Sequence, residues 1–365
     1  MKRKLFCLLA VFCLGAVIFL MPGCAAQKES EAMKFVAQMG NGINLGNSLD
    51  STGLREYEKD ADDLAYETFW GNPVLTREQF HAVKDAGFGT VRIPVTWEDH
   101  MDKRGTVSSQ WMDRVDEVVR MALEEDLYVI LDTHHEDWLD LDAGNRETAE
   151  EKFALLWEQI ALNFADCGEK LLFEGLNEPR KRDSAHEWDL GTEESREMLN
   201  ELNQIFVDTV RRTGENNETR YLLLDSYASN PISGGFDDFE IPKDSRIIVS
   251  IHAYFPYDFC QNMGEGAAAS FDRENKRDTE ELEAAFANAS QKFVEKEIPV
   301  ILTEFGCVDK SNDPSRREWL LSVMEFSGKY QIPCLWWDDG KDYKLLDRNS
   351  LQWNEELLKT FSLFD

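Results

Sequence analysis

Eight short apolar segments that alternate with longer amphipathic segments predict that this chain folds as a single (β/α)8 TIM barrel. The predicted strands cover residues 42–45, 90–94, 128–132, 171–175, 221–224, 247–251, 300–303 and 334–337. The predicted helices cover residues 77–86, 110–125, 150–164, 196–212, 279–295 and 315–327, where apolar residues recur every three or four positions. Helices in most of the intervals favour a closed barrel over an open doubly wound sheet.

Composition limits the class of partner. The chain has 365 residues, 42% of them hydrophobic, and can therefore bury a large core. Its formal net charge of -31 repels nucleic acid and anionic lipid head groups, so we expect neither as a partner. A neutral polymer meets no such repulsion, and the charge itself serves to keep the protein soluble.

The first residues have the pattern of a secretory signal peptide, assigned to residues 1–24. A basic start at residues 2–4 precedes an apolar run that ends at residue 21, too short for a stable membrane span. Cys24 follows the small residue Gly23, which predicts a bacterial lipoprotein acylated on Cys24. Cleavage near Ala26 is the alternative and would release a free protein. Both outcomes predict a secreted or cell-surface location.

We assign residues 25–34 to a short linker and residues 35–365 to one domain, because no low-complexity hinge interrupts the pattern. Four cysteines lie beyond the leader, at Cys167, Cys260, Cys307 and Cys334, widely spaced and without a CxxC pair. This spacing argues against a zinc site and predicts buried free thiols, with one disulfide at most. A barrel of this size closes its own core, so we expect a monomer.

Polar side chains follow seven of the eight predicted strands, at the end where the strands of a barrel open into its active-site face. A buried polar group without a partner costs free energy, so a core strand has no structural use for such residues. They indicate one polar site assembled across the barrel mouth. They include Asn47, Arg92, His134, His135, Asn177, Glu178, His252, Tyr254 and Glu304.

Two of these residues, Glu178 and Glu304, follow the fourth and seventh strands. Hydrolysis of a glycoside needs one carboxyl group that protonates the leaving oxygen and one that attacks or activates water. Carboxyl groups about 5 to 5.5 Å apart would indicate a retaining mechanism. We expect Arg92 to keep Glu304 ionised, and burial beside a negative partner to raise the pKa of Glu178.

Aromatic residues in the same loops suit the apolar faces of sugar rings. Trp97, Trp138, Tyr254 and Trp337 all lie near the predicted mouth, and Trp337 directly ends the eighth strand. Any single tryptophan could instead pack onto the barrel rim. Adjacent His134 and His135 point in different directions on an extended chain, and no phosphate-binding loop is evident. We therefore expect neither a catalytic metal nor an organic cofactor.

The sequence resembles glycoside hydrolase family 5, and most closely its subfamily 4 endo-β-1,4-glucanases and xyloglucanases. The similar stretches span almost the whole of the predicted domain and are specific as a set. They are NLGNSLD at 44–50, ETFWGNP at 67–73, FGTVRIPVTW at 88–97, DTHHE at 132–136, LNEP at 176–179, HAYFPYDF at 252–259, LTEFG at 302–306, WWDDG at 336–340 and LLDR at 345–348.

The resemblance implies roles for individual residues. Glu178 would be the acid/base and Glu304 the nucleophile. Arg92, His134, Asn177, His252, Tyr254 and Trp337 would support them around the reacting sugar. Within that set, Asn177 would hold the sugar 2-hydroxyl and Tyr254 would hydrogen-bond the nucleophile. Asn47 and His135 match positions that line the glycone side of the site. The glycone is the part of the substrate whose anomeric carbon the nucleophile attacks.

The departures from the family pattern are few. Ser48, Asp339 and Lys344 stand where Thr, Asn and Gly are usual, and the last two put subsite detail in doubt while leaving the chemistry intact.

Taken together, the sequence predicts a retaining endo-β-1,4-glycanase that hydrolyses a plant β-glucan polysaccharide: cellulose chains, xyloglucan or mixed-linkage glucan. A β-mannanase or xylanase on the same fold remains an alternative. A second alternative, from another class, is a non-catalytic surface protein that binds glycans.

Overall fold

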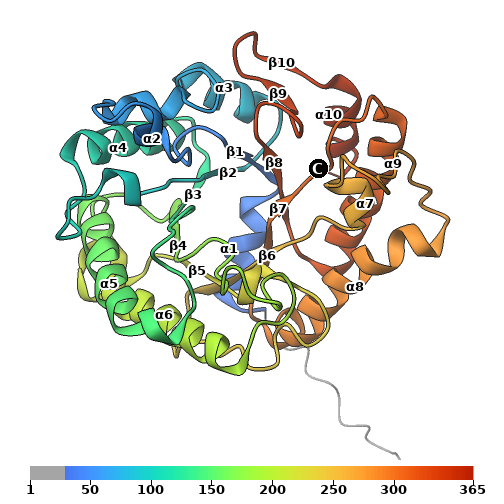
Figure 1. Ribbon diagram of the computed structural model, residues 1–365. Helices are drawn as coiled ribbons and strands as arrows, with labels where there is room; N and C mark the ends of the chain where they lie inside the picture. The colour runs from blue at the N-terminus through green and yellow to red at the C-terminus, as the bar shows by residue number, and fades with distance from the viewer. Residues whose placement is uncertain (1–28, 365) are drawn as a thin grey trace, which may run out of the picture.

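The computed structural model describes residues 29–364 and shows a closed barrel of eight parallel strands in sequence order, with β1 paired to both β2 and β8 (Figure 1). The TIM-barrel prediction is confirmed. Each strand is a nearly continuous apolar run because helices cover the barrel on its outside. The strands are β1 (Gly42–Leu45), β2 (Thr90–Ile93), β3 (Tyr128–Asp132), β4 (Leu171–Glu174), β5 (Leu222–Asp225), β6 (Ile247–His252), β7 (Val300–Phe305) and β8 (Cys334–Asp338).

Apart from the first helix, the helices form a ring around the barrel (Figure 1). The six predicted helices correspond to α3 (Arg77–Asp85), α4 (Ser109–Glu124), α5 (Arg146–Asn163), α6 (Glu193–Arg212), α8 (Lys276–Lys292) and α9 (Asp313–Tyr330). The pattern did not predict α1 (Glu31–Met39), α2 (Leu54–Tyr57), α7 (Tyr257–Cys260), α10 (Glu355–Phe361) or the small antiparallel pair β9 (Leu346–Asp347) and β10 (Gln352–Trp353). Short 3-10 turns occupy several loops, at Asp63–Thr68, Glu98–His100, Ala143–Asn145, Glu215–Glu218, Tyr227–Ser229 and Val294–Lys296.

Helix α1 packs against the interior of the barrel, and this corrects the predicted linker at residues 25–34. The Ser30 hydroxyl caps the helix by accepting from Met33 N at 3.1 Å, and Ser30 N donates to Glu297 at 2.8 Å. Phe35 stacks on Tyr221 with ring centroids 3.9 Å apart. Because α1 buries its apolar face among inward-pointing strand residues, the folded domain begins before residue 35.

The described residues bear on two further predictions. Cys167, Cys260, Cys307 and Cys334 are all buried free thiols, so within residues 29–364 there is no disulfide. No helix in that range is long and apolar enough to span a membrane. The predicted signal peptide and the acylation site Cys24 lie outside the described residues.

Candidate active site

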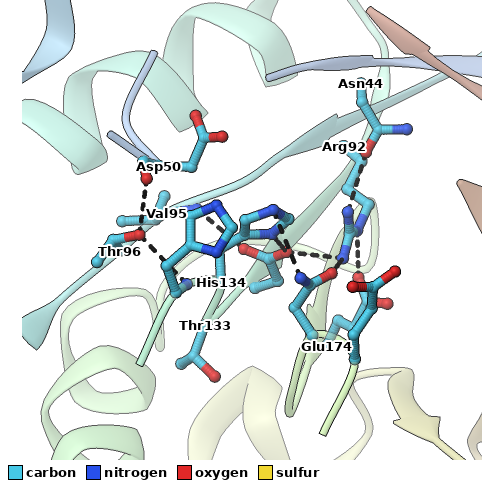
Figure 2. Close-up of polar contacts among 12 residues, drawn as sticks. Asn44, Asp50, Arg92, Val95, Thr96, Thr133, His134 and Glu174 are labelled. Atoms are coloured by element: carbon cyan, nitrogen blue, oxygen red, sulfur yellow. Dashed lines mark hydrogen bonds and ion pairs between the residues drawn. The ribbon is translucent and has the colours of Figure 1, made fainter. Parts of the chain in front are cut away.

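Arg92 lies at the centre of the polar cluster inside the barrel mouth, with its side chain fully buried (Figure 2). Its Nε is 2.5 Å from Glu174, its Nη1 is 2.6 Å from Glu304, and its Nη2 is 2.7 Å from Asp132. The same guanidinium donates to Asn44 at 3.1 Å. One cation therefore holds carboxylates from three strands at fixed positions, which a buried charge requires.

Glu304, at the end of β7, is almost fully buried and receives two strong donors. Arg92 donates to Oε1 at 2.6 Å and the Tyr254 hydroxyl donates to Oε2 at 2.9 Å. Burial raises the pKa of Glu304, while the positive charges of His252 and Arg92 act in the opposite direction. The two donors fix the orientation of the carboxylate toward the mouth.

Glu178 follows β4 in a left-handed backbone conformation, with φ of 46°, which is uncommon outside glycine. Its backbone N–H donates to Ser229 Oγ at 3.2 Å, and its Oε1 lies 3.0 Å from His252 Nδ1. The side chain is 22% exposed, so it faces the opening. One carboxylate oxygen of Glu178 lies within 4.8 Å of one from Glu304.

The charges in the free site differ from the sequence-based expectation. Burial acts to raise the pKa of Glu178, but the hydrogen bond and positive charge of His252, together with Arg180, lower it to about 2. Burial acts to lower the pKa of His252, but Glu304 and Glu178 raise it to about 9. The predicted rise in the pKa of Glu178 is therefore wrong for the free site, because His252 holds the proton that the two carboxylates share.

Asn177 is locked by its neighbours. Its Oδ1 accepts from Arg92 at 2.9 Å, and its Nδ2 lies 3.5 Å from His134 Nε2. His134 is held in turn by Asp132, whose Oδ2 is 2.8 Å from Nδ1. Burial lowers the pKa of His134 well below its ordinary value, so this ring is neutral. Figure 2 shows His134 lying between the loop that carries Asp50 and the Arg92 cluster.

Trp337 is the residue before the last one of β8 and lies parallel to His134, with ring centroids 5.6 Å apart and planes 3° apart. The indole packs directly on Gly46, where a Cβ atom would come within 2.5 Å of its ring. Gly46 is thus required by the close approach of an aromatic ring to the backbone.

Asn47 and His135 lie on the same side of the site. Asn47 has a left-handed φ of 56°, and its N–H donates to Asp50 at 2.9 Å. His135 packs against Trp70 with centroids 5.7 Å apart, and burial lowers the pKa of His135 to about 3. This side therefore presents neutral polar groups and aromatic rings, which suit an uncharged ligand.

Two side chains hold these loops together. Asn72 Nδ2 donates to the carbonyl oxygens of Gly46, Asn47 and Asp339. Arg348 donates to the Gly46 carbonyl at 2.8 Å and to Ser48 Oγ at 2.9 Å. The ETFWGNP and LLDR stretches therefore serve to position the loops after β1 and β8.

Trp97 does not line the site, which corrects its assignment as a substrate-binding residue. The side chain is fully buried, and its Nε1 donates to the Asp132 carbonyl at 3.1 Å. A sequence pattern cannot show whether a tryptophan after a strand turns inward or outward. Trp138 is half-buried, with its Nε1 on Glu136 at 2.6 Å and the Lys152 ammonium 4.3 Å from its ring centroid.

A cavity of about 700 Å³ opens beside Glu178, His252 and Tyr254. Its wall includes Trp188 and Tyr257, which are 56% and 59% exposed. Neither residue was singled out from the sequence. The sequence could have indicated Tyr257, because this residue lies in the HAYFPYDF stretch. Trp188 lies in a long irregular loop that has no periodic signal.

Among residues 29–364, three groups of side chains bring potential metal ligands within 4.8 Å of one another: Asp50 with His134 and His135, Glu174 with Asp225 and His252, and Glu178 with His252 and Glu304. Many of these atoms already have protein partners. Asp50, for example, accepts from the backbone N–H groups of Asn47 and Ser48 at 2.9 and 2.7 Å. The third group is the carboxylate pair described above.

The chain is similar in sequence to proteins of known function. It is 42% identical to endoglucanase A of Ruminococcus albus over 337 residues, 89% of this chain and 90% of that protein. It is 37% identical to endoglucanase B of Neocallimastix patriciarum, over 90% of this chain and 71% of that one.

Solved structures give the same grouping. A GH5-4 broad specificity endoglucanase from Clostridium longisporum superimposes with a TM-score of 0.86 at 34% identity, covering 92% of this chain and 99% of the other. A xyloglucan-specific endo-β-1,4-glucanase of family 5 from a metagenomic library gives 0.86 at 35%, with the same coverage. The family model for cellulase (glycosyl hydrolase family 5) matches residues 54–342. The chain therefore belongs to glycosyl hydrolase family 5, within its subfamily 4, and is a glycoside hydrolase.

Proposed function

We propose that this enzyme is an endo-β-1,4-glucanase that hydrolyses β-glucans with net retention of configuration. The observation that carries the proposal is the approach of the two carboxyl groups: one oxygen of Glu178 lies within 4.8 Å of one of Glu304. This spacing suits direct attack by a carboxylate, since an inverting enzyme separates its carboxyl groups by about 6.5 to 9.5 Å to admit water. The endoglucanases among its relatives support the β-1,4-glucan substrate.

In the first step Glu304 is the nucleophile. Arg92 and Tyr254 orient its carboxylate from both oxygens, so attack on the anomeric carbon needs little reorganisation. The bond from that carbon to the glycosidic oxygen breaks as the bond to Glu304 forms. Glu178, which faces the opening, protonates the departing oxygen.

The proton for that step is supplied through His252. In the free site the imidazolium donates from Nδ1 toward Glu178 Oε1 across 3.0 Å. Entry of a neutral sugar removes water from Glu178 and disfavours its charged form, so the proton moves onto the carboxyl group. In the second step Glu178 acts as a base, and water releases the sugar from Glu304.

The two sides of the site would bind different parts of the substrate, the glycone on one side and the aglycone on the other. Asn177, with its amide fixed by Arg92, is placed to hold the 2-hydroxyl of the reacting sugar. Trp337, Asn47 and His135 would contact the glycone. The cavity with Trp188 would take the aglycone, which is the part of the chain that leaves first.

The test is chromatography of the products from xyloglucan, mixed-linkage β-glucan, carboxymethyl cellulose, xylan and mannan at equal mass. Oligosaccharides from the glucans are expected, because the cavity of about 700 Å³ beside Glu178 offers room for sugar units beyond the cleaved bond. Release from xylan or mannan alone would contradict the substrate class. No release from any polymer would favour the non-catalytic binding protein.

A variant separates catalysis from binding. Glu304→Gln keeps the size of the side chain and its contact with Tyr254 but removes the nucleophile. We expect glucan hydrolysis to fall to background, with binding of cello-oligosaccharides retained in calorimetry. Unchanged hydrolysis would refute the assignment of Glu304.

We also propose that the protein is exported and tethered to a bacterial membrane through lipid on Cys24, and that it is a monomer. The apolar leader that ends at Gly23-Cys24 supports the tether. Mass spectrometry of the purified protein should show an acyl addition at Cys24, and a Cys24→Ala protein should lose membrane association. Sedimentation at two concentrations tests the monomer.

A further inference from the structure

Asp225 and His252 each carry a buried polar atom that lacks a hydrogen-bond partner among residues 29–364. These atoms are Asp225 Oδ2 and His252 Nε2. The β5–β6 register pairs Asp225 with Ser250, two residues before His252. A carboxylate oxygen of Asp225 lies within 4.8 Å of a ring nitrogen of His252. Buried polar atoms are rarely left without a hydrogen-bond partner, so the presence of two such atoms on neighbouring residues calls for an explanation.

Asp225 also reaches Glu178 by a second route. Its Oδ1 accepts from the Ser229 hydroxyl at 2.6 Å, and Ser229 Oγ accepts from the Glu178 backbone N–H at 3.2 Å. Ser229 itself has a left-handed φ of 49°. One buried carboxyl group thus lies behind both the ring that contacts the Glu178 side chain and the hydroxyl that holds its backbone.

We infer that Asp225 is a positioning residue for His252: its carboxyl group determines which ring nitrogen carries a proton, and through His252 whether Glu178 is protonated. The inference rests on the proposed role of Glu178. A carboxylate behind an imidazole fixes tautomer and orientation in the same way in hydrolytic triads.

The proton balance of this arrangement closes without an added reactant. Burial, and next the negative charge of Glu174, raise the pKa of Asp225 well above its ordinary value, while the positive charge of His252 acts to lower it. In the free site His252 is an imidazolium, with protons on both Nδ1 and Nε2. When the Nδ1 proton passes to Glu178, the Nδ1–H bond breaks and the Glu178 O–H bond forms. The ring and Glu178 both become neutral, and Nε2 keeps its proton, which Asp225 accepts as a hydrogen bond.

The other groups that face His252 define what a pH titration would report. Besides Asp225 they are Glu178, Glu304, Glu174, Asp132, Arg92 and His134. Only Asp225 offers His252 an oxygen that has no other partner in the described chain. A change at Asp225 should therefore alter the protonation of His252 without removing the contacts of Glu304 with Arg92 and Tyr254.

The test is ¹⁵N NMR of the histidine rings in the full-length protein, with the His252 signals assigned by their loss in His252→Gln. In the unsubstituted enzyme both nitrogens of His252 should be hydrogen-bonded up to about pH 8. In Asp225→Asn the apparent pKa of His252 should fall by at least about one unit, because the neutral amide does not stabilise the positive ring as a carboxylate does. A His252 that titrates near its ordinary pKa in the unsubstituted enzyme overturns the inference, whether or not Asp225→Asn folds.

Kinetics on aryl β-cellobiosides provide the second readout. For Asp225→Asn, kcat/KM with phenyl as leaving group should fall by about 10-fold or more, and that with 2,4-dinitrophenyl, which needs no acid, by less than about twofold. Equal losses on both substrates would indicate a merely structural role. Asp63→Asn is the matched control, because Asp63 lies 3.1 Å from the ring of His100, outside the site; its kinetics should be unchanged.

Failure of the proposed function can be distinguished from failure of this inference about Asp225. If Glu178→Ala lost activity equally on both leaving groups, Glu178 would not be the acid. The NMR titration of His252 would still decide whether Asp225 controls the ring.

Discussion

His252 Nδ1 lies 3.0 Å from Glu178 Oε1, so the imidazole and the proposed acid share a hydrogen bond before any substrate arrives. The same nitrogen is 3.5 Å from Glu304 Oε2. One ring nitrogen therefore contacts both carboxyl groups. In the free site the proton is on the ring, and the proposed mechanism requires it to reach Glu178 during catalysis.

This relationship predicts the basic limb of the pH profile. With its pKa raised to about 9, His252 stays protonated through neutral pH and loses its proton as the pH rises through that value. Because kcat/KM reports the free enzyme, its basic limb on phenyl β-cellobioside should lie near pH 9. A limb below pH 6 would show that Glu178 titrates independently of His252.

Glu178→Ala should depend on the leaving group. Loss of a general acid costs about 10² to 10⁴ in rate where the leaving oxygen needs a proton. Hydrolysis of phenyl β-cellobioside should fall by that factor, while the first step on the dinitrophenyl glycoside should be nearly unchanged. Added azide should then accelerate turnover by attacking the glycosyl-enzyme in place of water. Equal losses on both substrates would contradict the assignment.

Trp188→Ala tests the cavity as the aglycone side. Arg180 covers one face of the indole at 3.9 Å, so a sugar would stack on the opposite face. If that contact contributes about 1 kcal/mol, kcat/KM on long cello-oligosaccharides falls about fivefold, with aryl cellobiosides little affected. Leu162→Ala, at a 57% exposed position on α5, is the control. Equal effects of Trp188→Ala on short and long substrates would place the aglycone elsewhere.

Gly46→Ala should disturb Trp337. The new Cβ would come within 2.5 Å of the indole, which must move by roughly 1 Å to reach ordinary contact distance. A displacement of that size at a positioning residue lowers kcat/KM on the order of 10²-fold. Gly168→Ala is the matched control, because no atom lies within 4 Å of its added Cβ. Full activity in Gly46→Ala would show that Trp337 does not position the sugar.

The sequence predicted the barrel well because each strand is buried on both faces and reads as an unbroken apolar run. It placed the first turn of α1, residues 31–34, in a linker because these residues lie only a short distance after the predicted leader. The burial of these positions depends on the barrel interior, where Phe35 meets Tyr221, and this contact is not local in sequence.

The site was predicted in part. The site residues at the ends of strands could be predicted from the sequence, because barrel topology brings those ends together. Strand five was the single predicted strand without a polar end. The structure extends it by one residue, to Asp225, which is the buried carboxyl group behind His252. The inward turn of Trp97 and the outward turn of Trp188 depend on loop packing, which no period in the sequence encodes.

The stereochemistry of the first product tests the central claim most directly. Proton NMR during hydrolysis of cellotetraose or mixed-linkage glucan resolves the two anomers before they interconvert. With Glu178 and Glu304 oxygens within 4.8 Å, we predict that the β anomer appears first and the α anomer only later, by mutarotation. If the α anomer appeared first, water would be the direct nucleophile, and the covalent role of Glu304 would be wrong.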